Sequence, residues 1–253
     1  MKFSHPLIVL KTIVTFFIWG IVTILFIFVA TPFALLPEQY RYHNRCYYFL
    51  MHLVSLIIIR TALIKISIQG KENIPLYPNQ PSIIVINHTS ALDIPLVQML
   101  IGSYQHIWLS KEILSKIPLF GFVLRRMNVL VKKGGLAQSI NIVDQAYDIV
   151  KEQSCHVLIF PEGMRHTDGK IHKFYSGFAV LAQKLNRPII PIAIHGLHEI
   201  FPKKNILIHS LNNKVAIRIG QPIWYNKTKT KQEFLNIVRQ WFIHELEDLS
   251  KNF

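Results

Sequence analysis

A histidine and an aspartate five positions apart are the first residues in this chain whose types and spacing suit acid–base chemistry. His88 and Asp93 follow the β-branched run from Ile83 to Ile86, which is typical of a buried strand. Asp93 stands two positions before Pro95, an arrangement that is usual where a helix begins. On one continuous helix, residues five apart point about 140° away from each other, but in a strand–turn–helix they can converge. Asp93 would then hold one imidazole nitrogen and leave the other free as a base.

By itself this pair is also typical of a capping aspartate near a turn histidine, but three further stretches narrow the choice. They are Lys111-Glu112-Ile113-Leu114 followed by Pro118-x-x-Gly121, Phe160-Pro161-Glu162-Gly163-Met164-Arg165 after a second apolar strand, and Ile190-Pro191-Ile192. Together with Asn87-His88-x4-Asp93, their order and spacing resemble the four motifs of the glycerolipid acyltransferases. The resemblance covers residues 66–223.

The resemblance implies a reaction and its substrates. An acyl chain would pass from an activated thioester, acyl-CoA or acyl carrier protein, to the sn-2 hydroxyl of 1-acylglycerol-3-phosphate (lysophosphatidic acid). The product would be phosphatidic acid, in phospholipid biosynthesis. The thioester is then a co-substrate, and no cofactor is expected. Another lysolipid acceptor stays open, and so does the choice between the two donors.

Acyl transfer of this kind needs a base for the attacking hydroxyl and hydrogen-bond donors for the developing oxyanion. We expect His88 to be the base and Asp93 to orient it, as the HX4D motif of the family implies. No nucleophilic side chain is needed if the acceptor hydroxyl attacks the thioester directly. Ser90 is a conceivable nucleophile, but it lacks the Gly-x-Ser-x-Gly elbow. Asn87 either holds the turn or lines the site.

The phosphate of the acceptor requires cations, and the stretch 111–133 carries six of them against one carboxylate. Arginine offers phosphate a planar fork and lysine a point charge. By resemblance, Lys111 and Arg165 are the expected phosphate ligands, and Glu162 would bind an acceptor hydroxyl. Gly163 would let the backbone approach the ligand closely. The alternatives are a solvated basic face turned to lipid headgroups and, for Glu162 and Arg165, a surface ion pair.

The chain departs from the family pattern at four positions. Met164 stands where threonine is usual and His166 where serine is common, beside the expected phosphate site. Met127 replaces a frequent glycine, and Lys133 replaces an arginine, which keeps the charge but loses the fork. The first two leave the identity of the acceptor open, and none of the four removes the histidine–aspartate pair.

Metal and nucleotide chemistry have less support. His166, Asp168 and His172 could suggest a metal site, but their segment is loop-like and has no second carboxylate or cysteine cluster, so we expect no metal. No glycine-rich phosphate loop is present, so an adenine nucleotide would arrive only as part of acyl-CoA. The two cysteines, Cys46 and Cys155, indicate neither a disulfide framework nor a zinc site.

The formal charge of +14, together with 51% hydrophobic residues, indicates an anionic partner and an apolar setting. Nucleic acid and an anionic membrane surface would both suit the charge, but no nucleic-acid recognition motif is visible and the N-terminus is apolar. We therefore expect anionic membrane lipids, and not nucleic acid, as partners. A basic membrane-surface protein without activity is the rival class, and the intact set of His88, Asp93, Glu162 and Arg165 argues against it.

The apolar N-terminus predicts a membrane anchor over residues 1–64. Thr12 to Ala30 is a run of 19 uncharged residues, and the expected transmembrane helix covers residues 7–30. A signal peptide is the rival interpretation, although its apolar core is usually shorter. A second apolar run, 46–60, follows a polar connection over 31–45 and is too short to span, so it would lie in the interface or pack on the first. Basic residues flank both runs, so the resemblance alone suggests the cytoplasmic (inner) membrane, with the catalytic domain on the cytoplasmic side.

Strands alternate with helices through residues 65–253, the predicted acyltransferase domain. This order is typical of an α/β fold with a mixed, largely parallel sheet flanked by helices. In such sheets functional loops lie at the carboxyl ends of strands, where His88 and Glu162 fall. Strands are expected at 65–69, 83–86, 107–109, 129–131, 157–160, 189–194, 206–208 and 215–219, and helices at 93–101, in parts of 113–127, and at 136–152, 176–185 and 230–250.

Overall fold

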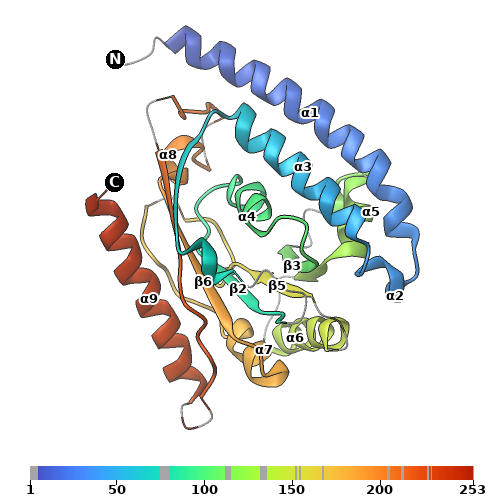
Figure 1. Cartoon of the computed structure of the whole chain (residues 1–253), viewed down its shortest axis with the longest axis vertical. Helices are drawn as coiled ribbons and strands as arrows, with labels where there is room; N and C mark the ends of the chain where they lie inside the picture. The colour runs from blue at the N-terminus through green and yellow to red at the C-terminus, as the bar shows by residue number, and fades with distance from the viewer. Residues whose placement is uncertain are drawn as a thin grey trace.

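A seven-stranded sheet forms the centre of the described protein (Figure 1). The computed structural model describes residues 5–74, 80–111, 115–131, 136–151, 153, 155–166, 168–203, 206–211, 214–226, 228 and 230–252. The strand order is β1-β7-β6-β2-β5-β3-β4, and every neighbouring pair is parallel except β6 with β7. The expected mixed, largely parallel sheet is confirmed. The strands are β1 (Lys65–Gln69), β2 (Ile83–Ile86), β3 (His106–Lys111), β4 (Val129–Val131), β5 (His156–Ile159), β6 (Ile189–His195) and β7 (Lys214–Ile219).

Strand β2 shows why the sheet has to be covered on both faces. All of its residues are fully buried. Because side chains alternate along a strand, Ile83 and Val85 pack into one layer of helices, and Ile84 and Ile86 pack into the other. The unbroken apolar run in the sequence is therefore what a central parallel strand requires.

Helices on the two faces complete the core. One layer contains α6, α7 and α9, with buried residues such as Val143, Phe178 and Phe242. The other contains α4, which buries Leu96 and Val97 against the sheet, and the end of α3. Figure 1 shows α9 on one side of the strands, and α3 and α4 on the other. The bounds are α3 (Arg45–Thr61), α4 (Asp93–Ile101), α6 (Leu136–Val150), α7 (Gly177–Leu185) and α9 (Lys231–Asn252).

Helix α1 (His5–Leu35) contains the one segment in the described part of the chain, Pro6–Leu35, that is long and apolar enough to cross a membrane. It runs beside α3 (Figure 1). Polar side chains on its inner side bond to the rest of the protein: Thr15 Oγ1 donates to the Thr61 carbonyl (3.4 Å), and Trp19 Nε1 donates to Thr61 Oγ1 (3.0 Å). Nearer its start, Thr12 Oγ1 accepts the N–H of Ile208 (3.1 Å). Its outer side exposes large apolar residues, among them Leu10, Ile13, Phe17, Ile24, Leu25 and Phe28.

The predicted polar connection over 31–45 is wrong in part. Helix α1 continues through Pro32 to Leu35, and α2 (Glu38–Arg41) follows it. Proline removes one helical hydrogen bond, but it need not end a helix that tertiary contacts hold. Here Ala30 and Ala34, on either side of the proline, are fully buried in a cluster shared with α5 (Phe120–Met127), and this packing maintains the helix.

The predicted strand at 206–208 is also wrong. These residues form an irregular segment, because the Ile208 N–H bonds to α1 instead of to a neighbouring strand.

The helix expected in parts of 113–127 is confirmed from Phe120 to Met127, whereas 112–114 lie outside the described residues. The structure adds a short helix, α8 (Leu197–Ile200), and a 3-10 turn, η1 (Lys71–Asn73).

Candidate active site

His88 lies in the turn after β2, and Asp93 is the first residue of α4. The turn brings the two side chains together, with His88 Nδ1 2.8 Å from Asp93 Oδ2. The same carboxylate oxygen accepts the backbone N–H groups of Thr89 (2.7 Å) and Ser90 (2.8 Å), and Asp93 is fully buried. Because the ionised carboxylate can only accept hydrogen bonds, Nδ1 of His88 carries the proton. Nε2 then has its lone pair free to act as a base.

An aromatic ring fixes the plane of the His88 imidazole. Phe160, the residue after β5, stacks on it with ring centroids 3.9 Å apart and planes 15° apart. Trp108 of β3 stacks in turn on Phe160 at 5.3 Å. No role was predicted for Phe160 beyond its place in a motif, because a stacking partner cannot be identified from the sequence without the register of β2 and β5.

Asn87 and Ser90 hold the turn around His88. The Asn87 amide donates to the Ile194 carbonyl (2.9 Å) and accepts the Ile194 N–H (2.8 Å), which joins the end of β2 to β6. Ser90 is fully buried, and its hydroxyl donates to the Phe201 carbonyl (2.8 Å). Of the two predictions for Asn87, this geometry supports the one in which its side chain holds the turn. The Ser90 hydroxyl also holds the turn, through its bond to the Phe201 carbonyl.

Glu162 is a buried carboxylate that joins two loops. One oxygen accepts the backbone N–H of His88 (3.0 Å), and the other accepts the N–H of His172 (3.0 Å). The side chain is almost fully buried, so these donors replace the water that an ionised carboxylate would otherwise require. Glu162 therefore positions the backbone of the candidate base, and its expected contact with an acceptor hydroxyl stays a prediction.

Gly163 and Arg165 follow in the same loop. Gly163 has φ 67°, and its N–H donates to the Phe160 carbonyl (3.1 Å), so a tight turn requires the left-handed conformation there. The next residues return to the site, since the His166 N–H donates to the His88 carbonyl (2.9 Å). The Arg165 side chain is half-buried and has no hydrogen bond or ion pair with any residue that the structure describes. A half-buried guanidinium of this kind is available for an anion.

Lys111 is the last residue of β3, opposite Val131 of β4. The order of the parallel strands β2, β5 and β3 places their carboxyl ends along one edge of the sheet, with His88, Glu162 and the backbone of Lys111 in series. The rest of that motif, 112–114, and Lys133 lie outside the described residues. The structure thus groups His88, Asp93, Glu162, Gly163 and Arg165, and it places Lys111 at the same edge by its strand.

His166 and His172 stack on each other with centroids 3.6 Å apart. Asp168 Oδ2 lies 2.9 Å from His172 Nε2. Among the described residues, no group of three or more histidine, cysteine, aspartate or glutamate side chains could hold a metal ion. These contacts connect residues within the loop that carries Arg165.

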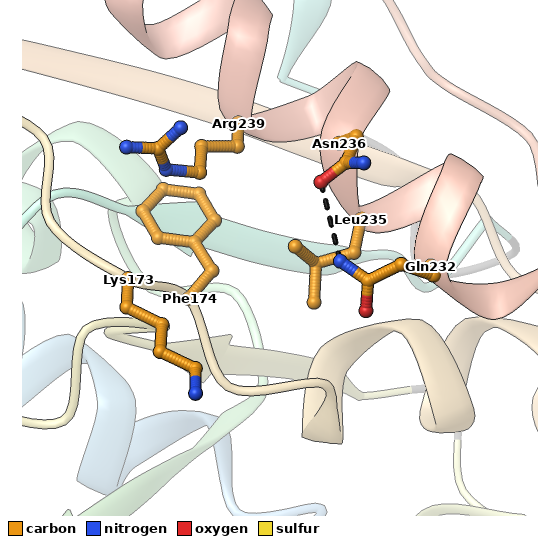
Figure 2. Close-up of a pocket in the computed structure, with 6 residues that line it drawn as sticks. All are labelled: Lys173, Phe174, Gln232, Leu235, Asn236 and Arg239. Carbon is orange, nitrogen blue, oxygen red and sulfur yellow. Dashed lines mark hydrogen bonds between the residues drawn. The ribbon is translucent and has the colours of Figure 1, made fainter.

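A hollow of about 290 Å³ lies behind this loop, between it and α9 (Figure 2). Arg239 of α9 donates to the carbonyls of Ile171 (3.2 Å) and His172 (3.1 Å) and so fixes the loop from behind. None of the predicted site residues lines this hollow. Its lining residues are Lys173, Phe174, Gln232, Leu235, Asn236 and Arg239.

The chain is similar to known proteins in sequence and in fold. The Acyltransferase family model matches residues 65–195. A chloroplastic 1-acyl-sn-glycerol-3-phosphate acyltransferase of Brassica napus is 32% identical over 211 residues, covering 82% of this chain and 58% of the relative. The 1-acyl-sn-glycerol-3-phosphate acyltransferase of Borreliella burgdorferi is 27% identical over 206 residues, 81% of each chain. The crystal structure of the 1-acyl-sn-glycerophosphate (LPA) acyltransferase of Thermotoga maritima has the same fold, with a TM-score of 0.76 and 23% identity over 96% of this chain and 95% of that one.

The chain spans 58% and 55% of the lengths of two chloroplastic relatives, those of Brassica napus and Arabidopsis thaliana. The family match nevertheless covers more than half of the 253 residues of this chain. It includes the turn with His88 and Asp93 and the loop from Glu162 to Arg165. This chain belongs to the acyltransferase family.

Proposed function

We propose that the protein transfers an acyl chain from a thioester to the sn-2 hydroxyl of 1-acylglycerol-3-phosphate and so produces phosphatidic acid. The observation that carries this proposal is the 2.8 Å contact between His88 and a buried Asp93, which leaves Nε2 of His88 as a base. The half-buried Arg165 lies in the loop after β5. The N–H of the next residue, His166, donates to the His88 carbonyl. A base and a cation without an ion-pair partner among the described residues, both at one edge, suit an acceptor that carries both a hydroxyl and a phosphate. The names of the relatives from Brassica napus and Borreliella burgdorferi support the same acceptor.

In the proposed mechanism, Nε2 of His88 removes the proton of the acceptor hydroxyl while the oxygen attacks the thioester carbonyl carbon. Asp93 holds the imidazole in place and stabilises the imidazolium that forms. The tetrahedral intermediate collapses, the carbon–sulfur bond breaks, and the imidazolium returns its proton to the leaving thiolate. The products are the new ester and a free thiol, so no oxidant or cofactor enters the balance.

Arg165 and Lys111 are proposed to bind the acceptor phosphate. A guanidinium can make two parallel hydrogen bonds to phosphate oxygens, and lysine adds a point charge. Acyl-CoA or acyl carrier protein supplies the thioester in this proposal. The basic charge of the chain suits either donor, because both carry negative charge.

The proposed location is the cytoplasmic membrane, with the catalytic domain on its cytoplasmic side. Support comes from α1, whose outer side exposes apolar residues such as Phe17 and Phe28. The net charge of +14 suits anionic headgroups on the same surface.

A second acceptor, another lysolipid, is favoured by one departure from the family motif. Met164, where threonine is usual, is 48% exposed in the loop that carries Arg165. An apolar side chain there would suit an acceptor headgroup other than a bare phosphate.

The test is an acyl-transfer assay with the purified protein in mixed micelles. Lysophosphatidic acid, monoacylglycerol and lysophosphatidylcholine would each be offered with acyl-CoA and with acyl carrier protein loaded with the same chain. The proposal expects the highest kcat/KM with lysophosphatidic acid. A higher value with another lysolipid would replace the acceptor, and no transfer to any acceptor with either donor would overturn the proposed activity.

A further inference from the structure

The turn between β3 and α5 has a backbone conformation that apolar residues rarely adopt. Leu119 has φ 58° and ψ −55°, and the Phe120 N–H donates to the Pro118 carbonyl (2.6 Å). These features are those of a γ-turn with positive φ, which is rare and strained. Such strain persists only where surrounding contacts maintain it, and it is concentrated at functional sites.

Two neighbours hold the strained turn in place. The Gly121 N–H donates to the Ile117 carbonyl (2.7 Å), and a Cβ at Gly121 would collide with the Ser115 carbonyl oxygen. Arg125 Nη1 donates to that same oxygen (2.6 Å). The glycine in the spacing Pro118-x-x-Gly121 therefore allows the chain to fold back tightly, with Leu119 at the tip of the turn.

The turn exposes two large apolar side chains. Ile117 is 50% exposed and Leu119 is 58% exposed. Exposing them in water gives no hydrophobic stabilisation in return for the strain. Lys116 and Arg125, which flank the tip, are exposed as well. Residues 115–131 contain three basic residues and no aspartate or glutamate.

The helix that follows the turn packs against the end of α1. Val123 and Met127 of α5, the helix that follows the turn, pack with Ala30 and Ala34 of α1. Arg126 Nε donates to the Ala34 carbonyl (2.9 Å), which fixes α5 to the end of α1. Figure 1 shows α5 beside α1 and on the side of the sheet away from α9. A lipid surface that covers the outer side of α1 would therefore also lie near this turn.

We propose that the Ile117–Leu119 turn is a second lipid-inserted element, which enters the bilayer beside α1. Ile117 and Leu119 would contact acyl chains, and Lys116 and Arg125 would contact the phosphates of anionic headgroups. This inference rests on the membrane location proposed above. The turn begins six residues after Lys111, a proposed phosphate ligand, so the acceptor would meet the site at headgroup depth.

The experiment uses the full chain with Cys46→Ser, because Cys46 is the exposed cysteine and Cys155 is buried. An environment-sensitive fluorophore would be attached to Leu119→Cys or Ile117→Cys, and the protein would be placed in vesicles of phosphatidylcholine and phosphatidylglycerol. Spin-labelled lipids would quench any fluorophore in the acyl region. Phe28→Cys on the outer side of α1 is the positive control, and Ile237→Cys on α9, 38% exposed, is the matched control away from α1.

We expect the labels at 117 and 119 to be blue-shifted and quenched nearly as strongly as the label at 28, while the label at 237 is unaffected. If the label at 28 is quenched and those at 117 and 119 behave like that at 237, the turn proposal is wrong and the membrane location stands. A blue shift without lipid quenching would mean that a second copy covers the turn, and this also overturns the proposal. If the label at 28 is not quenched either, the proposed membrane location itself fails.

Discussion

Histidines lie at both edges of the central strands, and their surroundings differ completely. At the carboxyl edge, His88 contacts Asp93 at 2.8 Å, and its side chain is 14% exposed. At the amino edge, His106 begins β3 and His156 begins β5, directly opposite each other, and both are buried. Burial lowers the pKa of each of these two to about 4, and for His156 the neighbouring His106 and Arg187 lower it further.

The difference shows what makes a histidine suitable as a base. His156 Nδ1 accepts the backbone N–H of Ser82 (3.0 Å), and His106 Nδ1 donates to the Tyr104 carbonyl (2.7 Å). These rings bond to the backbone, have no carboxylate partner in the described structure, and stay neutral. At His88, a buried carboxylate can stabilise the charged ring that forms when the free nitrogen accepts a proton.

The sharpest test of this comparison is to remove one histidine from each edge. His88→Ala should lower kcat by at least about a hundredfold, because general base catalysis contributes about that much or more. His106→Asn keeps a donor for the Tyr104 carbonyl and should keep kcat within a few-fold. Acyl transfer in micelles gives kcat, and thermal unfolding shows that both variants are folded. If His88→Ala retains more than about a tenth of the activity, His88 is not the base.

Asp93→Asn should lower kcat by as much as His88→Ala or somewhat less. The amide oxygen can still accept the N–H groups of Thr89 and Ser90, but a neutral group cannot stabilise the imidazolium. The readout is kcat together with KM, which should change little because Asp93 does not touch the acceptor. A loss in KM alone would indicate that Asp93 shapes the binding site and does not act through His88.

At the amino edge, the expected effect is on stability and not on activity. In the unfolded chain His106 and His156 titrate near 6.5, whereas in the folded protein the pKa of each is about 4. The unfolded chain therefore binds more protons below pH 6.5, and stability falls as the pH is lowered from 6.5 to 4. The expected loss is roughly 2–3 kcal/mol for each histidine.

Urea unfolding of the micelle-bound protein at several pH values between 7 and 4 measures this loss. The double variant His106→Asn, His156→Gln is the matched control, and its stability should depend much less on pH. An equal acid loss in the double variant would assign the effect to other groups.

The smallest expected effect concerns the phosphate contact at the carboxyl edge. Arg165→Lys and Lys111→Ala should each lower kcat/KM for lysophosphatidic acid by about ten- to a hundredfold, because losing a charge-assisted hydrogen bond costs roughly 1.5–3 kcal/mol. The loss should shrink with monoacylglycerol, which has no phosphate. Equal losses on both acceptors would mean that these residues support the fold or the donor site.

Local patterns in the sequence predicted the central elements well. The run Ile83 to Ile86 indicated a buried strand, and the Asp93-x-Pro95 start placed α4 at its observed bounds, because both depend on neighbouring residues. From there the parallel sheet and the meeting of His88 with Asp93 followed. The acyltransferase motifs placed Glu162 and Arg165 in the loop after β5, at the same edge.

Contacts between distant segments could not be predicted. The Asn87 amide meets Ile194, which is 107 positions away, and Glu162 meets the His88 N–H from 74 positions away. No local sequence pattern identifies the backbone groups of Ile194 and His88 as these partners, because the backbone of any residue could make the same hydrogen bond. The same holds for Ile208, whose apolar neighbours suggested a strand until its bond to Thr12 showed otherwise.

That bond between Thr12 and Ile208 has a consequence for how the chain is made. The two residues are 196 positions apart, so α1 leaves the ribosome long before the segment that bonds to it exists. Until then Thr12 lacks its partner at Ile208, whereas Thr15 and Trp19 can already bond to Thr61, which is made soon after them. Complete packing of this helix is therefore a late event of synthesis, although its residues are made long before Ile208.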